Sequence, residues 1–160
     1  MQQQSKPASP QKGAANQEPM LRQLKPSMEV LGIIASFLTR EPPFSEFRAG
    51  KLLAAIRFQL SSRNHVAMLK GETLIGYCGW LPITNALGDK WMANKAKLVP
   101  VPQEAADAVA LTMVSFTSRE HLLPMIRECR RLQPNRRVFF KRERKAGLSS
   151  KASVFNRQSG

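Results

Sequence analysis

The side chains that most often carry acid–base, nucleophilic or metal-binding chemistry are scarce in this sequence. It contains two histidines, His65 and His121, and two cysteines, Cys78 and Cys129. His65 stands at the entry of an apolar run and His121 in the first turn of a predicted helix, so we expect surface or capping roles for both. With no H-E-x-x-H motif, no C-x-x-C pair and too few cysteines for a four-cysteine site, the sequence predicts no metal site.

Cys129 is the thiol with the more reactive neighbourhood. Arg127, Arg130 and Arg131 lie close to it in sequence, and nearby positive charge lowers the pKa of a thiol. No histidine is placed to act as its base, so the sequence favours a structural thiol over a nucleophile. Cys78 lies within an apolar run and is expected to be a buried small hydrophobic residue. The glycines near it match neither G-x-x-x-x-G-K nor G-x-G-x-x-G, so no phosphate-binding loop is predicted.

The positive charge of the chain is concentrated at its C-terminal end. Among the 160 residues, 25 Lys and Arg stand against 11 Asp and Glu, a net charge of +14. Residues 126–160 carry eleven basic and two acidic residues, or +9, whereas residues 1–25 carry +3 and residues 26–125 only +2. Two interpretations of the C-terminal excess stay open, namely phosphate contacts with a nucleic acid and docking of an acidic protein. No zinc-finger, RNP or KH pattern supports the first.

Composition divides the chain into one domain and two flanking segments. Residues 1–25, rich in Gln, Ser, Pro and Lys, predict a disordered basic leader, and residues 146–160 predict a flexible basic tail. The domain itself is expected over residues 26–145. The start lacks the apolar core of a secretory signal, and the longest strongly apolar stretch, residues 30–38, is about half of what a bilayer requires. We therefore expect a cytoplasmic protein without a transmembrane segment.

Inside this domain, helical and strand-like periodicities alternate. Tyr77 and Gly79 should point to one face of a strand, and Cys78 and Trp80 to the other. We expect this strand to belong to the core and to line the functional site. The order of elements predicts an α/β (α+β) fold, a mixed sheet flanked by helices in a single domain. The expected helices run from Ser27 toward Pro42, over 50–60 and over 118–132; the expected strands cover 66–69, 73–80, 108–116 and 136–141; residues 82–102 are mostly loop with an edge strand at 97–101.

Several segments, taken in order, resemble one known family. The pattern resembles the RTX-toxin-activating lysine acyltransferases, the hemolysin-activator family, over about residues 27–145. Its most distinctive part is the strand Gly76-Tyr77-Cys78-Gly79-Trp80, which is similar to the Ala-Tyr-Cys-Ser-Trp-like strand of the family. The other segments are Leu31-Gly32 at the start of an apolar helix, Pro42-Pro43, Leu53-Ala54-Ala55-Ile56 and Asn64-His65-Val66-Ala67-Met68-Leu69.

The resemblance implies a fold similar to that of the GNAT acetyltransferases and a cytoplasmic protein that often forms a homodimer. Family members take a fatty acyl chain from acyl-acyl carrier protein, with no other bound cofactor, and transfer it to internal lysines of a secreted protoxin. The implied partners are an acyl carrier protein and a target protein, either an RTX-type toxin or another secreted protein. Arg130, Arg131, Arg136 and Arg137 are the residues expected to bind the acidic carrier.

The sequence departs from the family at the two positions that its chemistry needs most. The position of the family's essential histidine is Ser45, and the position of its essential aspartate is Met113. A serine hydroxyl without a base is inert near neutral pH and a thioether does not titrate, so neither frees a lysine amine of its proton. Glu46 is a candidate for a displaced carboxylate base, and His65 is the other conceivable substitute.

Two functions from different classes follow. The first is a protein-lysine acyltransferase that uses acyl carrier protein, weak or inactive because of the two replacements and relying mainly on proximity. The alternative is a catalytically dead relative that acts as a binding or regulatory adaptor, in one version contacting nucleic acid through its basic C-terminal segment. The resemblance favours the first function, and the missing histidine and aspartate favour the second.

Overall fold

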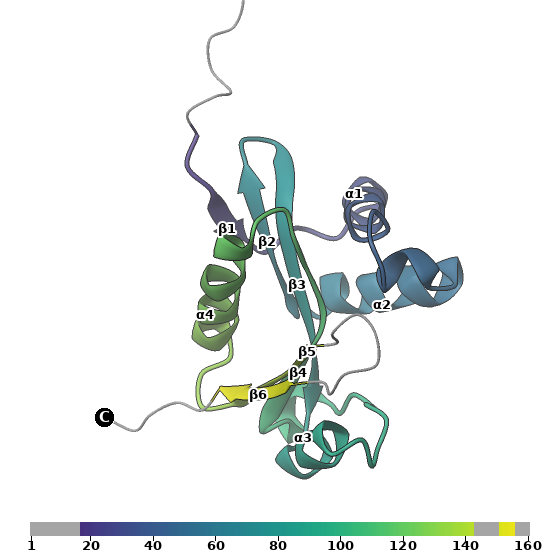
Figure 1. Ribbon diagram of the computed structural model, residues 1–160, viewed down its shortest axis with the longest axis vertical. Helices are drawn as coiled ribbons and strands as arrows, with labels where there is room; N and C mark the ends of the chain where they lie inside the picture. The colour runs from purple at the N-terminus through teal and green to yellow at the C-terminus, as the bar shows by residue number, and fades with distance from the viewer. Residues whose placement is uncertain (1–16, 143–150, 156–160) are drawn as a thin grey trace, which may run out of the picture.

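The sheet of this protein follows the order of the chain. The computed structural model describes residues 17–142 and 151–155, and in them six strands lie side by side in sequence order. All neighbouring strands are antiparallel except β4 and β5, which are parallel (Figure 1). The strands are β1 (Met20–Arg22), β2 (His65–Lys70), β3 (Thr73–Ile83), β4 (Ala108–Phe116), β5 (Arg137–Arg142) and β6 (Lys151–Phe155).

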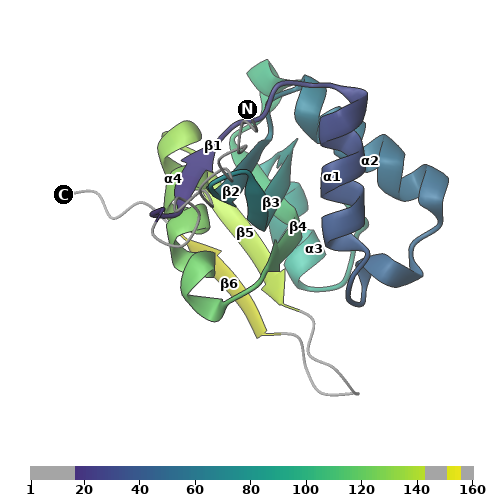
Figure 2. The same ribbon diagram turned by 90° about the horizontal axis from the view of Figure 1, so that it is seen from above.

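Helices cover both faces of this sheet, which confirms the expected mixed sheet flanked by helices. α1 and α2 lie on one face and α4 lies on the other, with α3 at the end where β4 and β5 begin (Figure 1, Figure 2). No helix in the described ranges combines the length and the apolar character needed to cross a membrane. The helices are α1 (Met28–Leu38), α2 (Ala49–Ser61), α3 (Asn85–Met92) and α4 (Leu122–Leu132), and the short 3₁₀ turns are η1 (Phe44–Glu46), η2 (Gln103–Ala105) and η3 (Arg119–His121).

The alternation expected along β3 divides the core into two layers. Tyr77 packs on the side of α1 and α2, with Ile34 and Ile56 in the same cluster. Trp80 packs on the other side, in a cluster that includes Met125 of α4. Both aromatic residues are fully buried, so β3 contributes to the core on its two faces.

α1 begins where the sequence predicts. The Oγ atom of Ser27 accepts a hydrogen bond from the backbone N–H of Val30 at 3.0 Å and so caps the helix. Leu31, Ile34 and Leu38 are buried, and their spacing of three and four residues places them on one face. The Ser27 cap and the burial of the apolar face therefore both stabilise α1.

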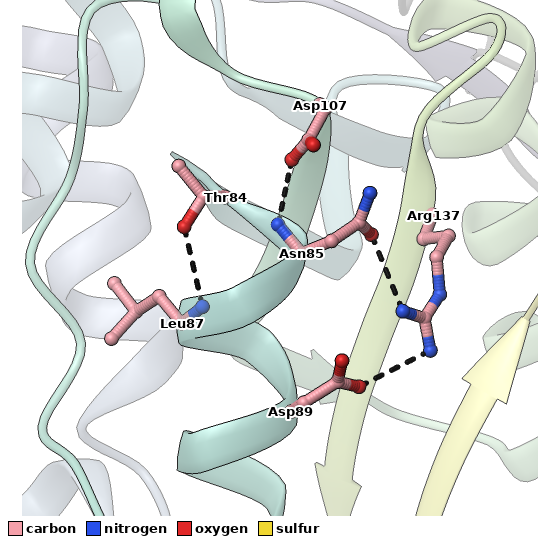
Figure 3. A network of polar contacts seen from close by, with 6 residues as sticks. All are labelled: Thr84, Asn85, Leu87, Asp89, Asp107 and Arg137. Atoms are coloured by element: carbon pink, nitrogen blue, oxygen red, sulfur yellow. Dashed lines mark hydrogen bonds and ion pairs between the residues drawn. The ribbon is translucent and has the colours of Figure 1, made fainter.

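The prediction of a loop over residues 82–102 is wrong in its first half, where α3 forms. Thr84 caps this helix, since its Oγ1 accepts a hydrogen bond from the N–H of Leu87 at 3.2 Å. Asp107 Oδ1 accepts from the N–H of Asn85 at 2.6 Å (Figure 3). Because Asp107 lies just before β4, part of the start of α3 is stabilised by a residue far along the chain.

The sequence predicts that Gly88 lies in a loop, but it lies inside α3, where it packs against the sheet. A Cβ atom at Gly88 would lie 2.3 Å from the ring of Phe139 on β5, so only glycine permits this close approach of helix and sheet. The edge strand expected at residues 97–101 does not form. Val101 instead donates a backbone hydrogen bond to the carbonyl of Pro82 at 2.9 Å.

Strands also form outside the expected domain boundaries. β1 lies within the segment expected to be a disordered leader, and it pairs with β2 with Met20 opposite Leu69. β6 lies within the segment expected to be a flexible tail and pairs with β5. Backbone pairing at a sheet edge needs no apolar periodicity, so composition carries no signal of it. Residues 1–16 of the leader, residues 146–150 and 156–160 of the tail, and residues 143–145 at the end of the expected domain lie outside the described residues.

A pair of truncations tests the contribution of β1. A chain that starts at Gln17 keeps β1 and the hydrogen bond from the N–H of Leu24 to His65 Nε2 (2.8 Å), whereas a chain that starts at Lys25 lacks both. We expect the shorter chain to melt at least about 4 °C lower, because roughly 1 kcal/mol produces such a shift in a domain of this size. Calorimetry measures the difference, and equal melting temperatures would show that β1 contributes nothing to stability.

Candidate active site

The parallel strands β4 and β5 pair only near their beginnings. In the described residues, their pairing joins positions 108–111 of β4 to positions 137–140 of β5, and both strands run on beyond it. We call the place where this pairing ends, just after Leu111 and Phe140, the fork.

An irregularity in β4 accounts for the fork. On its other side β4 pairs with β3, where Gly79 is opposite Met113 but Trp80 is opposite Leu111. Thr112 is therefore an extra residue on β4, a β-bulge. A bulge bends its strand and increases the local twist, and here the bend begins where β4 and β5 stop pairing.

A cavity of about 410 Å³ opens at the fork. Its lining comes from both faces of the sheet, since Phe44 and Trp91 belong to the side of α1, α2 and α3, whereas Phe116 and Leu122 pack on the side of α4. Five of the lining residues are aromatic, so an apolar ligand fits this space best. The lining residues are Pro43, Phe44, Phe47, Trp91, Leu111, Thr112, Val114, Phe116, Leu122, Phe140 and Lys141.

Lys141 brings a charged group to the cavity from β5. Its Nζ donates a hydrogen bond to the backbone carbonyl of Trp91 at 3.2 Å and contacts Oδ1 of Asn94. Nζ also lies 5.6 Å from the centroid of the Trp91 ring, within the range of a cation–π contact. These contacts tie the lysine to the end of α3 and hold its amine beside the cavity.

Thr112 is held by a buried chain of hydrogen bonds. The phenol of Tyr77 donates to Oε1 of Gln59 at 2.9 Å, and Nε2 of Gln59 donates to Oγ1 of Thr112 at 3.1 Å. Gln59 is fully buried, and burial raises the pKa of Tyr77, so its phenol stays protonated and donates. Sequence reasoning missed Gln59, although a polar residue on the apolar face of α2, beside Ile56 and Leu60, was a usable signal.

Tyr77 and Gly79 do not line the cavity; they support the residue that does. A Cβ atom at Gly79 would lie 2.0 Å from Oε1 of Gln59, so the missing side chain makes room for the glutamine amide. The strand β3 thus acts one layer below the cavity. We expected this strand to belong to the core and to line the site. It belongs to the core, and it contributes to the site only through Gln59 and Thr112.

His65 is not a surface residue, and its two ring nitrogens are both occupied. Nε2 accepts a hydrogen bond from the N–H of Leu24 at 2.8 Å, so the proton lies on Nδ1, which donates to the carbonyl of Gln59 at 3.1 Å. Burial lowers the pKa of His65, outweighing the opposing carbonyl of Gln59. A fully buried, fully bonded neutral imidazole is a structural group, so His65 does not substitute for the missing base.

The two positions that correspond to the family's histidine and aspartate lie in different environments. Ser45 and Glu46 are exposed in η1, next to Phe44, which lines the cavity. Met113 is 3% exposed and belongs to the core cluster of α1 and α2. The structure therefore brings η1 to the cavity and places Met113 in the hydrophobic core instead.

Three of the four arginines expected to bind an acidic partner lie together. Arg130, Arg131 and Arg136 line a groove of about 410 Å³ at the C-terminal end of α4, together with Arg127, Gln133, Pro134 and Asn135. We call this the arginine groove. Arg127 was missed, although its spacing of three and four residues from Arg130 and Arg131 places all three on one helix face. Leu122, which lines the cavity, is at the other end of α4, roughly 15 Å away along an 11-residue helix.

Arg137 lies elsewhere and has a structural role. Its guanidinium donates to Oδ1 of Asp89 at 3.3 Å and to Oδ1 of Asn85 at 3.4 Å, which ties β5 to α3 (Figure 3). It also lies 4.6 Å from the centroid of the Phe139 ring. Arg137 therefore belongs to the packing of α3 rather than to the arginine groove.

Neither cysteine is a reactive thiol. Cys78 and Cys129 are both free and buried. Burial raises the pKa of Cys78 to about 12, and burial together with the neighbouring Cys78 raises the pKa of Cys129. The arginines beside Cys129 in sequence do not reverse this effect. Among the described residues, no group of three or more His, Cys, Asp and Glu side chains is arranged to hold a metal ion.

Solved structures share this architecture, whereas no protein-family model and no curated protein matches the sequence. A GNAT family acetyltransferase from Brucella melitensis, in complex with acetyl-CoA, aligns with a TM-score of 0.54 at 10% identity, over 91% of this chain and 93% of the other. The mosquito arylalkylamine N-acetyltransferase like 5b aligns with a TM-score of 0.53 at 12% identity, over 78% of this chain and 76% of the other.

The chain therefore has the α/β fold of the GNAT acetyltransferases, in a single domain. This confirms the fold that the sequence resemblance implied. At such low identities the likeness concerns the fold, and function has to be argued from the cavity and the side chains around it.

Replacing Gly79 tests the support beneath the cavity. In Gly79→Ala the new methyl group displaces the amide of Gln59, and we expect a loss of stability of about 1–3 kcal/mol from overpacking and broken hydrogen bonds. Gly32→Ala is the matched control, because a Cβ there meets nothing within 4 Å inside α1 and the change removes helical glycine. Urea denaturation measures both variants, and equal stability of the two would contradict the assigned packing of Gln59.

The buried imidazole of His65 makes stability depend on pH. Because folding holds the pKa of His65 below its ordinary value of 6.5, the unfolded chain takes up the proton first as the pH falls. The contribution of the neutral His65 to the free energy of unfolding is therefore fully present above about pH 6.5 and decreases as the pH falls below it. We expect the urea midpoint to fall from about pH 7.5 to about pH 5.5 in the wild type and in His121→Gln, and to fall less in His65→Gln. The same decrease in all three proteins would contradict this role.

Proposed function

We propose that this protein is an acyltransferase that accepts a fatty acyl thioester at the fork and passes the acyl group to a lysine amine of a target protein. The observation that carries the proposal is the cavity between β4 and β5, which is apolar along most of its lining and is lined by residues from both faces of the sheet. In the proposed reaction the thioester approaches from one face and the amine from the other. The GNAT fold agrees with acyl transfer as the class of reaction.

The lining of the cavity favours a fatty acyl group. Phe47, Phe116 and Phe140 offer apolar surface well beyond what an acetyl group covers, and burying each methylene contributes about 0.8 kcal/mol. A longer acyl chain therefore gains affinity here that a two-carbon group cannot. This supports the resemblance to the RTX-toxin-activating family, whose members transfer fatty acyl chains.

The proposed donor is an acyl-acyl carrier protein. The connection from β4 to α4, residues 117–121, contains no glycine and includes Glu120, so it lacks the backbone cradle that a pyrophosphate such as that of CoA prefers at a helix N-terminus. The arginine groove offers a complementary surface for an acidic carrier. A carrier docked there delivers its acyl chain on a flexible prosthetic arm along α4.

The proposed acceptor is a lysine of an RTX-type toxin or another secreted protein. Its ammonium has to lose a proton before it attacks, and Glu46, exposed in η1 at the edge of the cavity, is the proposed base. Without the family's histidine and aspartate, transfer should be slower than in members that hold both, by about 10²–10⁴-fold. A cytoplasmic site of action and a homodimer belong to the same proposal, because both rest on the family resemblance.

A binding or regulatory adaptor is the second candidate. The observation that favours it is the chemistry of the lining, in which no described residue is a carboxylate or an imidazole. Such a protein would hold an acyl chain or its carrier without turning it over. Nucleic-acid binding receives less support, because the sequence contains no zinc-finger, RNP or KH pattern, and it is kept as an outcome of the test.

Fluorescence tests the binding step. Trp91 lines the cavity and Trp80 lies in the core, so a ligand in the cavity should change Trp91 emission, and Trp91→Phe should abolish that change. We expect palmitoyl-acyl carrier protein to bind with an affinity that decreases with salt. The double variant Arg127→Ala/Arg131→Ala should weaken this binding. The control Arg57→Ala, on the exposed face of α2, should not. Salt-dependent binding of DNA or RNA with no binding of the carrier would contradict the proposal.

A mass-spectrometric transfer assay tests catalysis with the same donor, with palmitoyl-CoA as the comparison and a candidate toxin as acceptor. We expect slow transfer, a further decrease in Glu46→Gln, and an increase of at least about tenfold in Ser45→His, which restores a base beside the cavity. Ser61→His, on the exposed end of α2, is the control. Rapid transfer that is unaffected by changes at Ser45 or Glu46 would refute the proposed base, and binding without any transfer would favour the adaptor.

A further inference from the structure

We propose that Thr112 and Lys141 form an oxyanion hole at the fork, which binds the carbonyl oxygen of the acyl thioester. This inference rests on the proposed function and names the residues that would stabilise charge in its reaction. It assigns to the cavity a pair of donors that the resemblance to known acyltransferases did not indicate.

The two residues occupy corresponding positions on neighbouring strands. Leu111 and Phe140 are the last residues that pair between β4 and β5. Thr112 and Lys141 are the next residue on each strand, and both line the cavity. The fork therefore presents one polar side chain from each strand, in a lining that is otherwise apolar or aromatic. In such surroundings a hydrogen bond to developing charge is strong, because little water competes with it.

Lys141 has a donor left for a ligand. An ammonium carries three N–H groups, and the Nζ of Lys141 uses two of them on the carbonyl of Trp91 and on Asn94 within the described chain. The same two contacts fix the position of Nζ, so its third N–H is held beside the cavity without a further loss of side-chain freedom when a ligand binds.

The buried network makes Thr112 a donor as well. Since the phenol of Tyr77 donates to Oε1 of Gln59, the Nε2 group of Gln59 is the one that faces Thr112, and Oγ1 of Thr112 has to accept from it. The proton of the Thr112 hydroxyl is then available to the cavity. A flipped amide would leave the buried phenol of Tyr77 without an acceptor among the described residues, which costs about 1–3 kcal/mol. The network thereby selects the orientation that frees the threonine proton.

The step starts once the acceptor lysine has given its ammonium proton to the proposed base Glu46, and from there it balances without a proton exchanged by either donor. The lysine nitrogen of the acceptor forms a bond to the thioester carbon, and the carbonyl oxygen takes up negative charge, which the N–H of Lys141 and the O–H of Thr112 stabilise. The C–S bond then breaks, the amide forms, the amine loses a proton and the leaving thiolate gains one. Neither Thr112 nor Lys141 has to change its own protonation, so this contribution survives the replacement of the family's acid–base residues.

Infrared spectroscopy of a bound thioester tests the inference without requiring turnover. With a carbonyl-labelled palmitoyl thioester, we expect a lower C=O stretching frequency in the wild type than in Lys141→Met or Thr112→Val, because two donors weaken the carbonyl bond. Lys141→Arg and Thr112→Ser should keep most of the shift, and Lys90→Met, on exposed α3, should keep all of it. In the transfer assay, kcat should fall about 10²–10³-fold in each disabling variant while KM changes little.

A thioether analogue separates this inference from the function on which it rests. The analogue lacks the carbonyl oxygen, so it should bind the wild type, Lys141→Met and Thr112→Val with affinities within about twofold of one another. The same carbonyl frequency in all of these proteins, with the analogue bound, would overturn the oxyanion hole and leave the proposed function standing. Failure of the analogue to bind the wild type would overturn both.

Discussion

One buried amide fixes the relation between the helices and the sheet. Gln59 reaches from α2 to the bulge of β4, accepting from Tyr77 and donating to Thr112. It passes over β3 at Gly79, where any side chain would overlap it. A buried amide that loses its partners costs about 1–3 kcal/mol, so α2, β3 and β4 keep a single arrangement. His65, bonded to the carbonyl of the same glutamine, extends this constraint to the start of β2.

The cavity is a consequence of that constraint. Two parallel strands that pair along their whole length leave no space between them, and side chains from opposite faces do not meet. Here the bulge at Thr112 ends the pairing after Leu111, and rings from both faces fill the rim of the opening without closing it. The position of the bulge is held by the amide from below. A structural hydrogen bond and a candidate active site therefore share one residue, which explains why a threonine stands within the apolar run 108–114 of β4.

The sequence predicts the elements whose signals are local and misses those that depend on distant residues. α1, β3 and β4 follow from the Ser27 cap and from apolar alternation, and the structure has them close to the expected bounds. α3 was missed because its start is stabilised by Asp107 and its glycine fits against Phe139. The candidate site was visible only in part for the same reason. Neither Lys141 nor Thr112 belongs to a sequence motif. Only the register of β4 and β5 places them at corresponding positions.

The two positions at which the resembled family holds its acid–base residues, Ser45 and Met113 here, differ in what a titratable side chain would cost. Ser45 is exposed beside the cavity, so a titratable group can return there at little cost. Met113 lies in the core with Tyr77, and a carboxylate at that position would be buried among apolar side chains, at a cost of several kcal/mol unless it is paired. An aspartate at position 113 is therefore incompatible with the apolar packing that surrounds Met113 in this chain. In the proposed reaction, donors that stabilise charge without titrating would therefore complement the base Glu46, and the fork places two such donors, Thr112 and Lys141, where β4 and β5 part.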